Sequence, residues 1–362
     1  MESRGPSLWR WRELLPVLSD DSIVTLGESM SPLLPVHRLG KLLGLTDVWV
    51  KDDSQLPTGS FKSRGQAVAI SMAKELGVRR VAIPTAGNAG GAMAAYAARA
   101  GMEAFVFMPS DTPAINKFEA ALAGARVFAV RGLITDCGKL VRSGKEAMGW
   151  FDMSTLKEPY RLEGKKTMGL EMAQQFKWKL PDVILYPTGG GTGLIGMWKA
   201  FQELLELDWL DSSKMPRMVC VQSSGCAPIV QAFEAGQRFA EPFPNAATIA
   251  SGIRVPAAVG DFMILDAVRN SQGTAIAVPE EQILSWMQQA VASEGISFCP
   301  ESAACVCAAM QLRSTGWIEP DERVVIYNCG AAQKYPHVAI PELRELDPNG
   351  EIDWATIGRH EE

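Results

Sequence analysis

The sequence predicts an α/β fold built on two mainly parallel sheets. Short apolar runs alternate with helical patterns over most of the 362 residues, which is typical of successive strand–helix–strand units. The length suits about two domains of ~150 residues each. Hydrophobic residues make up 47% of the chain and charged residues 21%, a globular composition that allows a sizeable core.

Strands are expected where short apolar runs stand between turn residues. These runs cover residues 81–84, 104–108, 126–130, 183–186, 218–222, 275–278 and 324–327. Helical patterns cover residues 90–100, 114–123 and 194–203, and another begins at Gln66. Residues 240–256 are rich in Pro, Asn and Ala and are expected to form a loop. One sheet is therefore expected within residues 55–165, and a second from about residue 170 onward, completed by the N-terminal segment.

Charge, hydropathy and cysteine usage argue against several classes of protein. The net charge of −6 gives no electrostatic reason to bind nucleic acid or an anionic membrane. No stretch reaches the ~20 apolar residues of a membrane span, and the N-terminus lacks a secretory signal pattern. The seven cysteines form no Cys-x-x-Cys motif, so reduced thiols in a cytoplasmic protein are expected. His37, His337 and His360 are too dispersed for a metal site, and no metal is expected.

A lysine stands just before one of the helical patterns. Lys62 lies in the segment PTGSFKSRG, residues 57–65, whose proline and glycine favour a turn. A helix dipole disfavours an ammonium ion at the helix N-terminus and lowers the pKa of the amine. A Schiff-base lysine needs this bias, since only the neutral amine attacks a carbonyl. On this segment alone, a solvated lysine in a surface turn is the more common arrangement.

Two further turns join a strand to a helix, where free backbone N–H groups can bind an anion. The first, PTAGNAGG at residues 84–91, contains Asn88, whose amide can donate to a phenolate or carboxylate oxygen; a helix cap with glycines for packing is the alternative. The second, PTGGGTG at residues 187–193, lets the backbone wrap around a phosphate, and Thr192 adds a hydroxyl. It is neither a dinucleotide fingerprint nor a P-loop. A phosphate site is therefore expected at residues 189–193.

The motifs, taken in order, resemble those of the threonine synthases, in the pyridoxal-phosphate (PLP) fold type II family that includes tryptophan synthase β. The resemblance runs over nearly the whole chain. Its short matches are WRELLP at 11–16, IVTLGE at 23–28, KDD at 51–53, GSFK at 59–62, RLEG at 161–164, GIRVP at 252–256 and KYP at 334–336. Many matches in one order are far more specific than any single one.

The resemblance implies two three-layer αβα domains with mainly parallel sheets. Residues 1–60 with 170–362 would form a large domain that binds the cofactor phosphate. Residues 61–169 would form a smaller, mobile domain that carries the loop around Asn88. The chain would be a homodimer that acts on a small amino-acid substrate, with pyridoxal 5'-phosphate as its cofactor.

The resemblance also implies roles for individual residues. Lys62, beside Phe61, would link the cofactor covalently and act as the moving base, and Asn88 would donate to the cofactor's ring oxygen. Cys329 would face the pyridine nitrogen, where the family has threonine; a buried cysteine at a strand end is the plain alternative. The cofactor phosphate would be held by Gly189, Gly190, Gly191, Thr192 and Gly193. The substrate would be bound by Thr85, Ala86, Gly87, Ala89 and Thr155, with Arg161 at its phosphate.

The implied reaction converts O-phospho-L-homoserine and water into L-threonine and phosphate. The chain departs from the family pattern at Ala89, which follows Asn88 where threonine is common, at Ser63, and at residues 329–333. These departures leave open a serine or threonine ammonia-lyase, a β-replacing synthase such as a cysteate synthase, and a PLP-binding protein without catalysis. A site for a substrate phosphate would distinguish them, and Arg161, Lys165 and Lys166 are the candidates that supply its charge.

Overall fold

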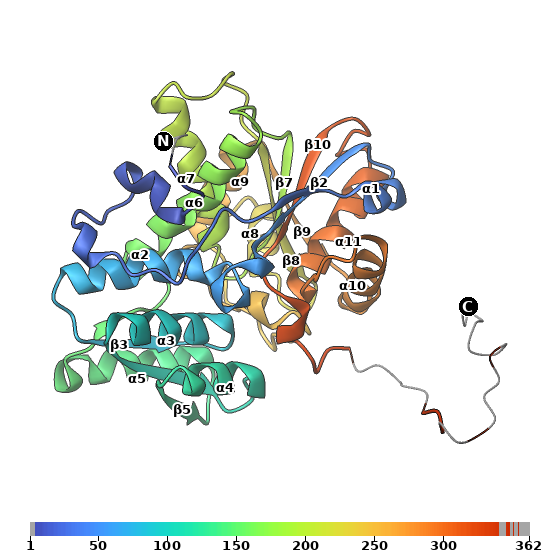
Figure 1. Cartoon of the computed structure of the whole chain (residues 1–362). Coiled ribbons are helices and arrows are strands. Elements are labelled where there is room, and N and C mark those ends of the chain that lie inside the picture. The colour runs from blue at the N-terminus through green and yellow to red at the C-terminus, as the bar shows by residue number, and fades with distance from the viewer. Residues whose placement is uncertain (1–3, 340–344, 348–349, 351–353, 355–362) are drawn as a thin grey trace.

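The strands of the computed structural model form two separate sheets (Figure 1). The model describes residues 4–339, 345–347, 350 and 354. Within these residues, one sheet has six strands in the order β1-β2-β10-β7-β8-β9, and the other has four in the order β5-β4-β3-β6. The strands are β1 (Leu33–Pro35), β2 (Asp47–Asp52), β3 (Arg80–Pro84), β4 (Glu103–Pro109), β5 (Arg126–Val130), β6 (Phe151–Asp152), β7 (Val183–Pro187), β8 (Arg217–Ser223), β9 (Thr274–Val278) and β10 (Arg323–Asn328).

Helices fill the connections between the strands. They are α1 (His37–Leu43), α2 (Lys62–Glu75), α3 (Asn88–Ala100), α4 (Ala114–Leu122), α5 (Ile134–Met148), α6 (Tyr160–Gln175), α7 (Thr192–Glu206), α8 (Pro228–Glu234), α9 (Asp261–Asn270), α10 (Glu280–Glu294) and α11 (Pro300–Ser314). Short 3-10 turns lie at Leu8–Leu14, Asp20–Ser22, Asp53–Gln55, Pro57–Gly59, Ser251–Ile253 and Ala332–Lys334. Every strand pairing is parallel except that of β1 with β2. The predicted α/β fold with mainly parallel sheets is confirmed.

The large sheet is covered by helices on both faces. Its central strands are apolar over most of their length, and successive side chains point to opposite faces. In β7, for example, Ile184 and Tyr186 pack in a core with α6, α7 and α9, whereas Val183 and Leu185 pack in a second core with α10 and α11. This alternation explains why the strands read as continuous hydrophobic runs and why three layers form.

The small sheet is sandwiched in the same way. Val81 and Ile83 of β3 pack in a core with α2 and α3, while Ala82 faces Trp150 and Val141 of α5 on the opposite side. Helix α6 packs against both α2 and α7 and so joins the two layered bodies. Division of the chain into domains at residues 60 and 170, and mobility of the smaller part, stay predictions.

The strands expected from residue 81 onward are confirmed, each to within one residue at either end. Three helix starts were placed too late: α2 begins at Lys62 rather than Gln66, α3 at Asn88, and α7 at Thr192. Residues 240–256 form no regular structure apart from the turn Ser251–Ile253, as expected for a loop. No helix in the described ranges is long and apolar enough to cross a membrane.

Candidate active site

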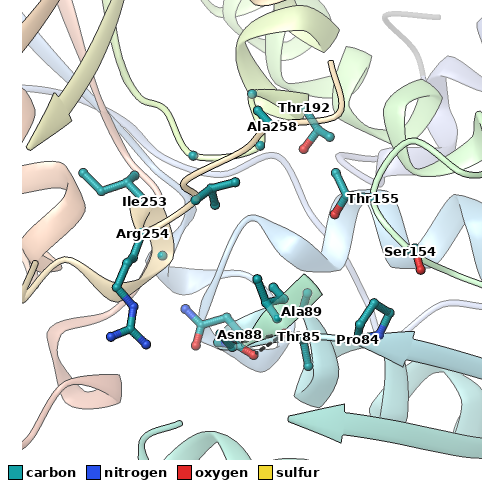
Figure 2. Close-up of a pocket in the computed structure, with 18 of the residues that line it drawn as sticks. Pro84, Thr85, Asn88, Ala89, Ser154, Thr155, Thr192, Ile253, Arg254 and Ala258 are labelled. Carbon is teal, nitrogen blue, oxygen red and sulfur yellow. Dashed lines mark hydrogen bonds between the residues drawn. The ribbon is translucent and has the colours of Figure 1, made fainter. Parts of the chain in front are cut away.

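A cavity of about 420 Å³ lies between the two layered bodies and is lined by segments that follow their strands. Figure 2 shows Thr192 and Ala258 on one side of it and Thr85, Asn88 and Ala89 on the other. Three of the site residues proposed from the sequence, Gly193, Lys165 and Lys166, do not line this cavity. The others do, and they are Phe61, Lys62, Thr85, Ala86, Gly87, Asn88, Ala89, Thr155, Arg161, Gly189, Gly190, Gly191, Thr192 and Cys329.

Four of the described helices begin at the cavity wall. The first residues of α2, α3, α5 and α7 are Lys62, Asn88, Ile134 and Thr192, and all four line the cavity. Parallel strands bring their following helix starts to one edge of a sheet, and each start carries unpaired N–H groups and a partial positive charge. The cavity is therefore suited to a ligand with several negatively charged groups.

Lys62 has the electrostatic environment of a reactive amine. Its Nζ lies 3.8 Å from the centre of the Phe61 ring. Burial lowers the pKa of Lys62 from 10.5 to about 8, and the positive charge of Arg161 acts in the same direction, while Cys329 opposes it. A useful fraction of the amine is therefore neutral near physiological pH.

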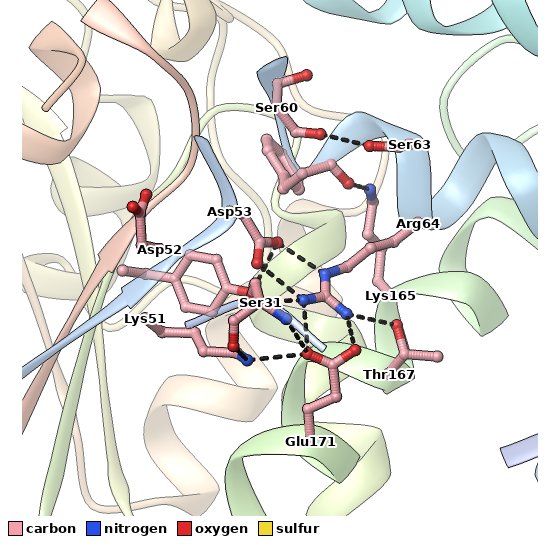
Figure 3. Close-up of polar contacts among 12 residues, drawn as sticks. Ser31, Lys51, Asp52, Asp53, Ser60, Ser63, Arg64, Lys165, Thr167 and Glu171 are labelled. Atoms are coloured by element: carbon pink, nitrogen blue, oxygen red, sulfur yellow. Dashed lines mark hydrogen bonds and ion pairs between the residues drawn. The ribbon is translucent and has the colours of Figure 1, made fainter. Parts of the chain in front are cut away.

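A buried ion network fixes the start of α2 behind Lys62 (Figure 3). The Arg64 guanidinium donates to both carboxylate oxygens of Asp53, at 2.7 and 2.8 Å, and to both of Glu171, at 2.6 and 2.8 Å. Lys51 also pairs with Glu171, at 2.8 Å. Burial alone would raise the pKa of Asp53, but the Arg64 charge lowers it below its usual value. Two cations balance two anions here, so the buried network carries no net charge.

The glycine turn between β7 and α7 leaves backbone exposed to the cavity. Gly191 has φ of +73°, which favours glycine. A Cβ at Gly190 would meet only a methyl group of Thr155, at 3.3 Å, whereas one at Gly189 would lie 2.8 Å from the carbonyl oxygen of Gly252. Gly193 does not line the cavity, because it packs against the Tyr186 hydroxyl.

A chain of hydrogen bonds crosses the cavity wall from the small sheet's helices to α11. Asn116 Nδ2 donates to Asn88 Oδ1 at 3.0 Å, and Asn88 Nδ2 donates to the Tyr335 hydroxyl at 3.3 Å. That hydroxyl donates to Glu301 Oε1 at 3.0 Å. The chain orients the Asn88 amide and holds its position relative to the large sheet.

The cavity wall also carries several cationic side chains. Arg161 is buried, and its guanidinium donates to the Met153 carbonyl oxygen at 2.7 Å and lies 3.9 Å from Glu158. Burial raises the pKa of Glu158 to about 7. Arg142 and Lys157 are exposed, and their side chains make no hydrogen bond or ion pair within the described part of the chain. Charge is thus available at the cavity for an anionic group.

Lys165 and Lys166, expected to add charge for a substrate phosphate, do not line the cavity. Lys165 is buried and donates to the Phe61 carbonyl oxygen. Lys166 pairs with Glu163 and Glu203, each at 2.8 Å. Lys165 follows Arg161 by one helical turn, and its Nζ lies 4.3 Å from the centre of the Phe61 ring, behind the cavity wall. Lys166 is held by its two glutamates on α6 and α7 instead.

A family model described as pyridoxal-phosphate dependent enzyme matches residues 24–330. The chain belongs to this family. It is 35% identical to threonine synthase of Methanocaldococcus jannaschii over 347 residues, which cover 95% of this chain and 85% of that protein. It is 36% identical to threonine synthase of Methanosarcina acetivorans over 346 residues, covering 95% and 84%.

Solved structures share the fold at lower identity. The maize serine racemase structure has a TM-score of 0.72 and 20% identity, covering 87% of this chain and 95% of that one. The processed form of threonine deaminase isoform 2 from Solanum lycopersicum has a TM-score of 0.73 and 20% identity, covering 92% and 94%.

The residues of this PLP-dependent enzyme fit its cofactor. The turn at Gly190 offers space that a Cβ would fill, at the start of α7, where a phosphate is favoured. Lys62 supplies an amine of depressed pKa in the same cavity. The buried Tyr186 hydroxyl lines the cavity and has no partner among the described residues. The set can hold an aldehyde cofactor with a phosphate arm.

The sequence motifs did not reveal every cavity residue. Glu301 lies in the first turn of α11, after Pro300. An acidic residue is common at that position because it stabilises the helix N-terminus. Arg142 lies in an amphipathic surface helix and resembles any solvated arginine. Arg254 lies in the GIRVP match, which could have marked it; it lines the cavity 3.3 Å from Asp111.

Proposed function

We propose that this PLP-dependent enzyme is a threonine synthase that converts O-phospho-L-homoserine and water into L-threonine and phosphate. The observation that carries the proposal is a cavity in which the depressed-pKa amine of Lys62 and the glycine turn of α7 stand together. Similarity to archaeal threonine synthases over 95% of the chain supports the choice of substrate.

PLP, when bound, supplies an electron sink for a carbanion at the substrate's α-carbon. Lys62 would hold the cofactor covalently, and its neutral amine would accept the substrate's α-proton; a pKa of about 8 suits this role. Gly189 to Gly191, with Thr192, would bind the cofactor phosphate through the turn and the start of α7. Asn88 would donate to the ring oxygen, and Cys329 would face the pyridine nitrogen.

The substrate would be held at the opposite wall. Thr85 to Ala89, at the start of α3, would bind its carboxylate, with Thr155 nearby. Arg161 remains the candidate for its phosphate, although Met153 and Glu158 already engage that guanidinium. Arg142 and Lys157, whose side chains have no partner in the described ranges, would share the phosphate charge.

The basic cavity wall favours a phosphorylated substrate over the unphosphorylated serine or threonine of an ammonia-lyase. A leaving phosphate needs positive charge around it, and a lyase acting on a hydroxyl amino acid does not. A homodimer, and division into a large domain and a smaller mobile one, remain part of the proposal.

A substrate panel tests the function directly. The purified holoenzyme is supplied with O-phospho-L-homoserine, L-serine or L-threonine, and phosphate, amino-acid products and 2-oxo acids are all measured. Equal amounts of phosphate and L-threonine are expected from the first substrate alone, and Lys62→Ala should form neither. Turnover of serine or threonine to a 2-oxo acid, without reaction of the phosphorylated substrate, would replace the proposal by the lyase.

A further inference from the structure

Three buried side chains bring two sulfur atoms and a carboxylate together beside the cavity. The ligand atoms of Cys299, Glu301 and Cys329 all lie within 4.8 Å of one another, and each residue is buried. Cys299 immediately precedes α11, Glu301 lies in its first turn, and Cys329 follows β10. The start of α11 and the end of β10, both in the large sheet's body, therefore bring the three side chains together.

The two sulfur atoms stand at the separation of a metal-bound thiolate pair. Cys299 Sγ and Cys329 Sγ are 3.6 Å apart. Two Zn–S bonds of about 2.3 Å at a tetrahedral angle separate their sulfur atoms by about 3.8 Å. The pair would bind a cation with little rearrangement of the backbone.

Glu301 points to a ligand independently of the two cysteines. Its Oε1 accepts from the Gly252 backbone N–H at 2.6 Å and from the Tyr335 hydroxyl at 3.0 Å. Its Oε2 is buried and has no hydrogen-bond partner among the described residues. A buried carboxylate oxygen without a partner is costly, and such atoms usually mark a missing ion, water or ligand.

Hydrogen bonds hold two of the three ligand side chains, those of Cys299 and Glu301, in place. Cys299 Sγ lies 3.0 Å from Ser302 Oγ, and the same hydroxyl accepts from the Cys329 backbone N–H at 3.0 Å. Glu301 is fixed by the two donors to its Oε1. Such outer contacts orient metal ligands and commonly affect affinity strongly.

We propose that Cys299, Glu301 and Cys329 form a binding site for one thiophilic divalent cation, Zn²⁺ or Cd²⁺, in the chain without its cofactor. Thiolate ligands select these cations over Mg²⁺ and Ca²⁺. The cation enters through the cavity, whose wall includes Glu301 and Cys329. Both thiols lose their protons to solvent on binding. Because Cys329 is the proposed neighbour of the cofactor ring, the cation and PLP compete; only this competition rests on the proposed function.

The sequence does not reveal this group, because its two cysteines lie 30 residues apart and form no Cys-x-x-Cys motif. The inference departs from the expectation that no metal binds.

Titration of the full chain, stripped of PLP, with Cd²⁺ tests the site. The thiolate-to-cadmium charge-transfer absorption in the ultraviolet reports the bond itself. We expect saturation at one Cd²⁺ per chain, and at least about tenfold weaker binding in Cys299→Ser. Cys137→Ser is the matched control, because Cys137 is also buried but lies on α5, and it should bind like the parent chain.

Absence of the absorption from the stripped chain would overturn the site, and so would equal binding by Cys299→Ser. Glu301→Gln keeps both thiols, so it should retain the absorption and bind Cd²⁺ more weakly. This variant tests the site if Cys299→Ser does not fold. The holoenzyme should take up Cd²⁺ only as its visible PLP absorption disappears. If the holoenzyme binds Cd²⁺ as tightly as the stripped chain does and keeps its PLP, only the proposed competition between Cd²⁺ and PLP is refuted. Failure of the threonine synthase activity would leave the metal titration unaffected.

Discussion

The Lys62 amine should react with PLP at a pH where an ordinary lysine is almost inert. Burial, assisted by Arg161, lowers its pKa from 10.5 to about 8. At pH 7, a group with a pKa of 8 is neutral in about one molecule in eleven, and a group with a pKa of 10.5 in about one in 3,200. The neutral fraction of Lys62 is therefore about 290 times that of an unperturbed lysine.

The rate of cofactor capture by the stripped full chain measures this fraction. PLP is added across a pH range that spans both values, and the visible absorption of the lysine-bound cofactor is followed. A free primary amine reacting with PLP supplies the cofactor's own pH dependence, which is divided out. We expect the corrected rate to rise with pH and level off above about pH 8.

Arg161→Gln should move the midpoint upward, because it removes a neighbouring positive charge that disfavours the ammonium form. Lys62→Ala should show no covalent capture at any pH. A midpoint near 10.5, in a protein that still binds PLP, would refute the inferred desolvation of Lys62. An unmoved midpoint in the arginine variant would refute the electrostatic contribution.

Further variants test the glycine turn, the buried network and the basic wall. Gly189→Ala should lower the melting temperature because its Cβ would lie 2.8 Å from a backbone carbonyl oxygen. Gly190→Ala should keep the stability of the parent chain and weaken PLP binding. Equal melting temperatures of the two variants would contradict this difference between the two glycines. Arg64→Met should cost roughly 3–5 kcal/mol in urea unfolding, since buried Asp53 loses its cation and Glu171 keeps only Lys51. That cost should shrink in acid, where those carboxylates become protonated. A cost that does not change with pH would contradict the loss of ion pairs as its cause. Arg142→Gln should raise KM for O-phospho-L-homoserine several-fold, unlike Arg126→Gln on edge strand β5; equal KM values would exclude Arg142 from the phosphate site.

Seven of the ten described strands could be predicted from apolar runs, whereas β1, β2 and β6 could not. Burial on both faces makes a central strand such as β7 a continuous apolar run. Val183–Pro187 is buried at every position, a pattern that survives without knowledge of its neighbours. Helix starts could not be placed as well, since they depend on turns. Ser60 is extended and pairs with Gly330 before α2 begins at Lys62. That contact joins segments 270 residues apart in the sequence.

The turn residues of the candidate site could be anticipated for a related reason. Loops that follow parallel strands lie at the carboxyl edge of their own sheet, where ligands commonly bind, so the Asn88 loop of the small sheet and the Thr192 loop of the large sheet could each be expected at a site. That the two loops line one cavity follows from the packing of the two sheets' bodies. Residues supplied by helix bodies carried no such signal: Glu301 and Arg142 reach the cavity only through the packing of α11 and α5. Gly193 belongs to the glycine run in the sequence, yet as the second residue of α7 it packs against Tyr186 instead of lining the cavity.

The central position of β10 governs when this enzyme can become complete during its own synthesis. Residues 80–152 are contiguous and can form the small sheet soon after they leave the ribosome. In the large sheet, by contrast, β10 is inserted between β2 and β7, and it is the last strand to be translated. Until then β2 has an unpaired edge, a feature that invites misassembly. Since Cys329 directly follows β10, a nascent chain that stops before residue 323 lacks a wall of the cavity and leaves the facing edges of β2 and β7 unpaired.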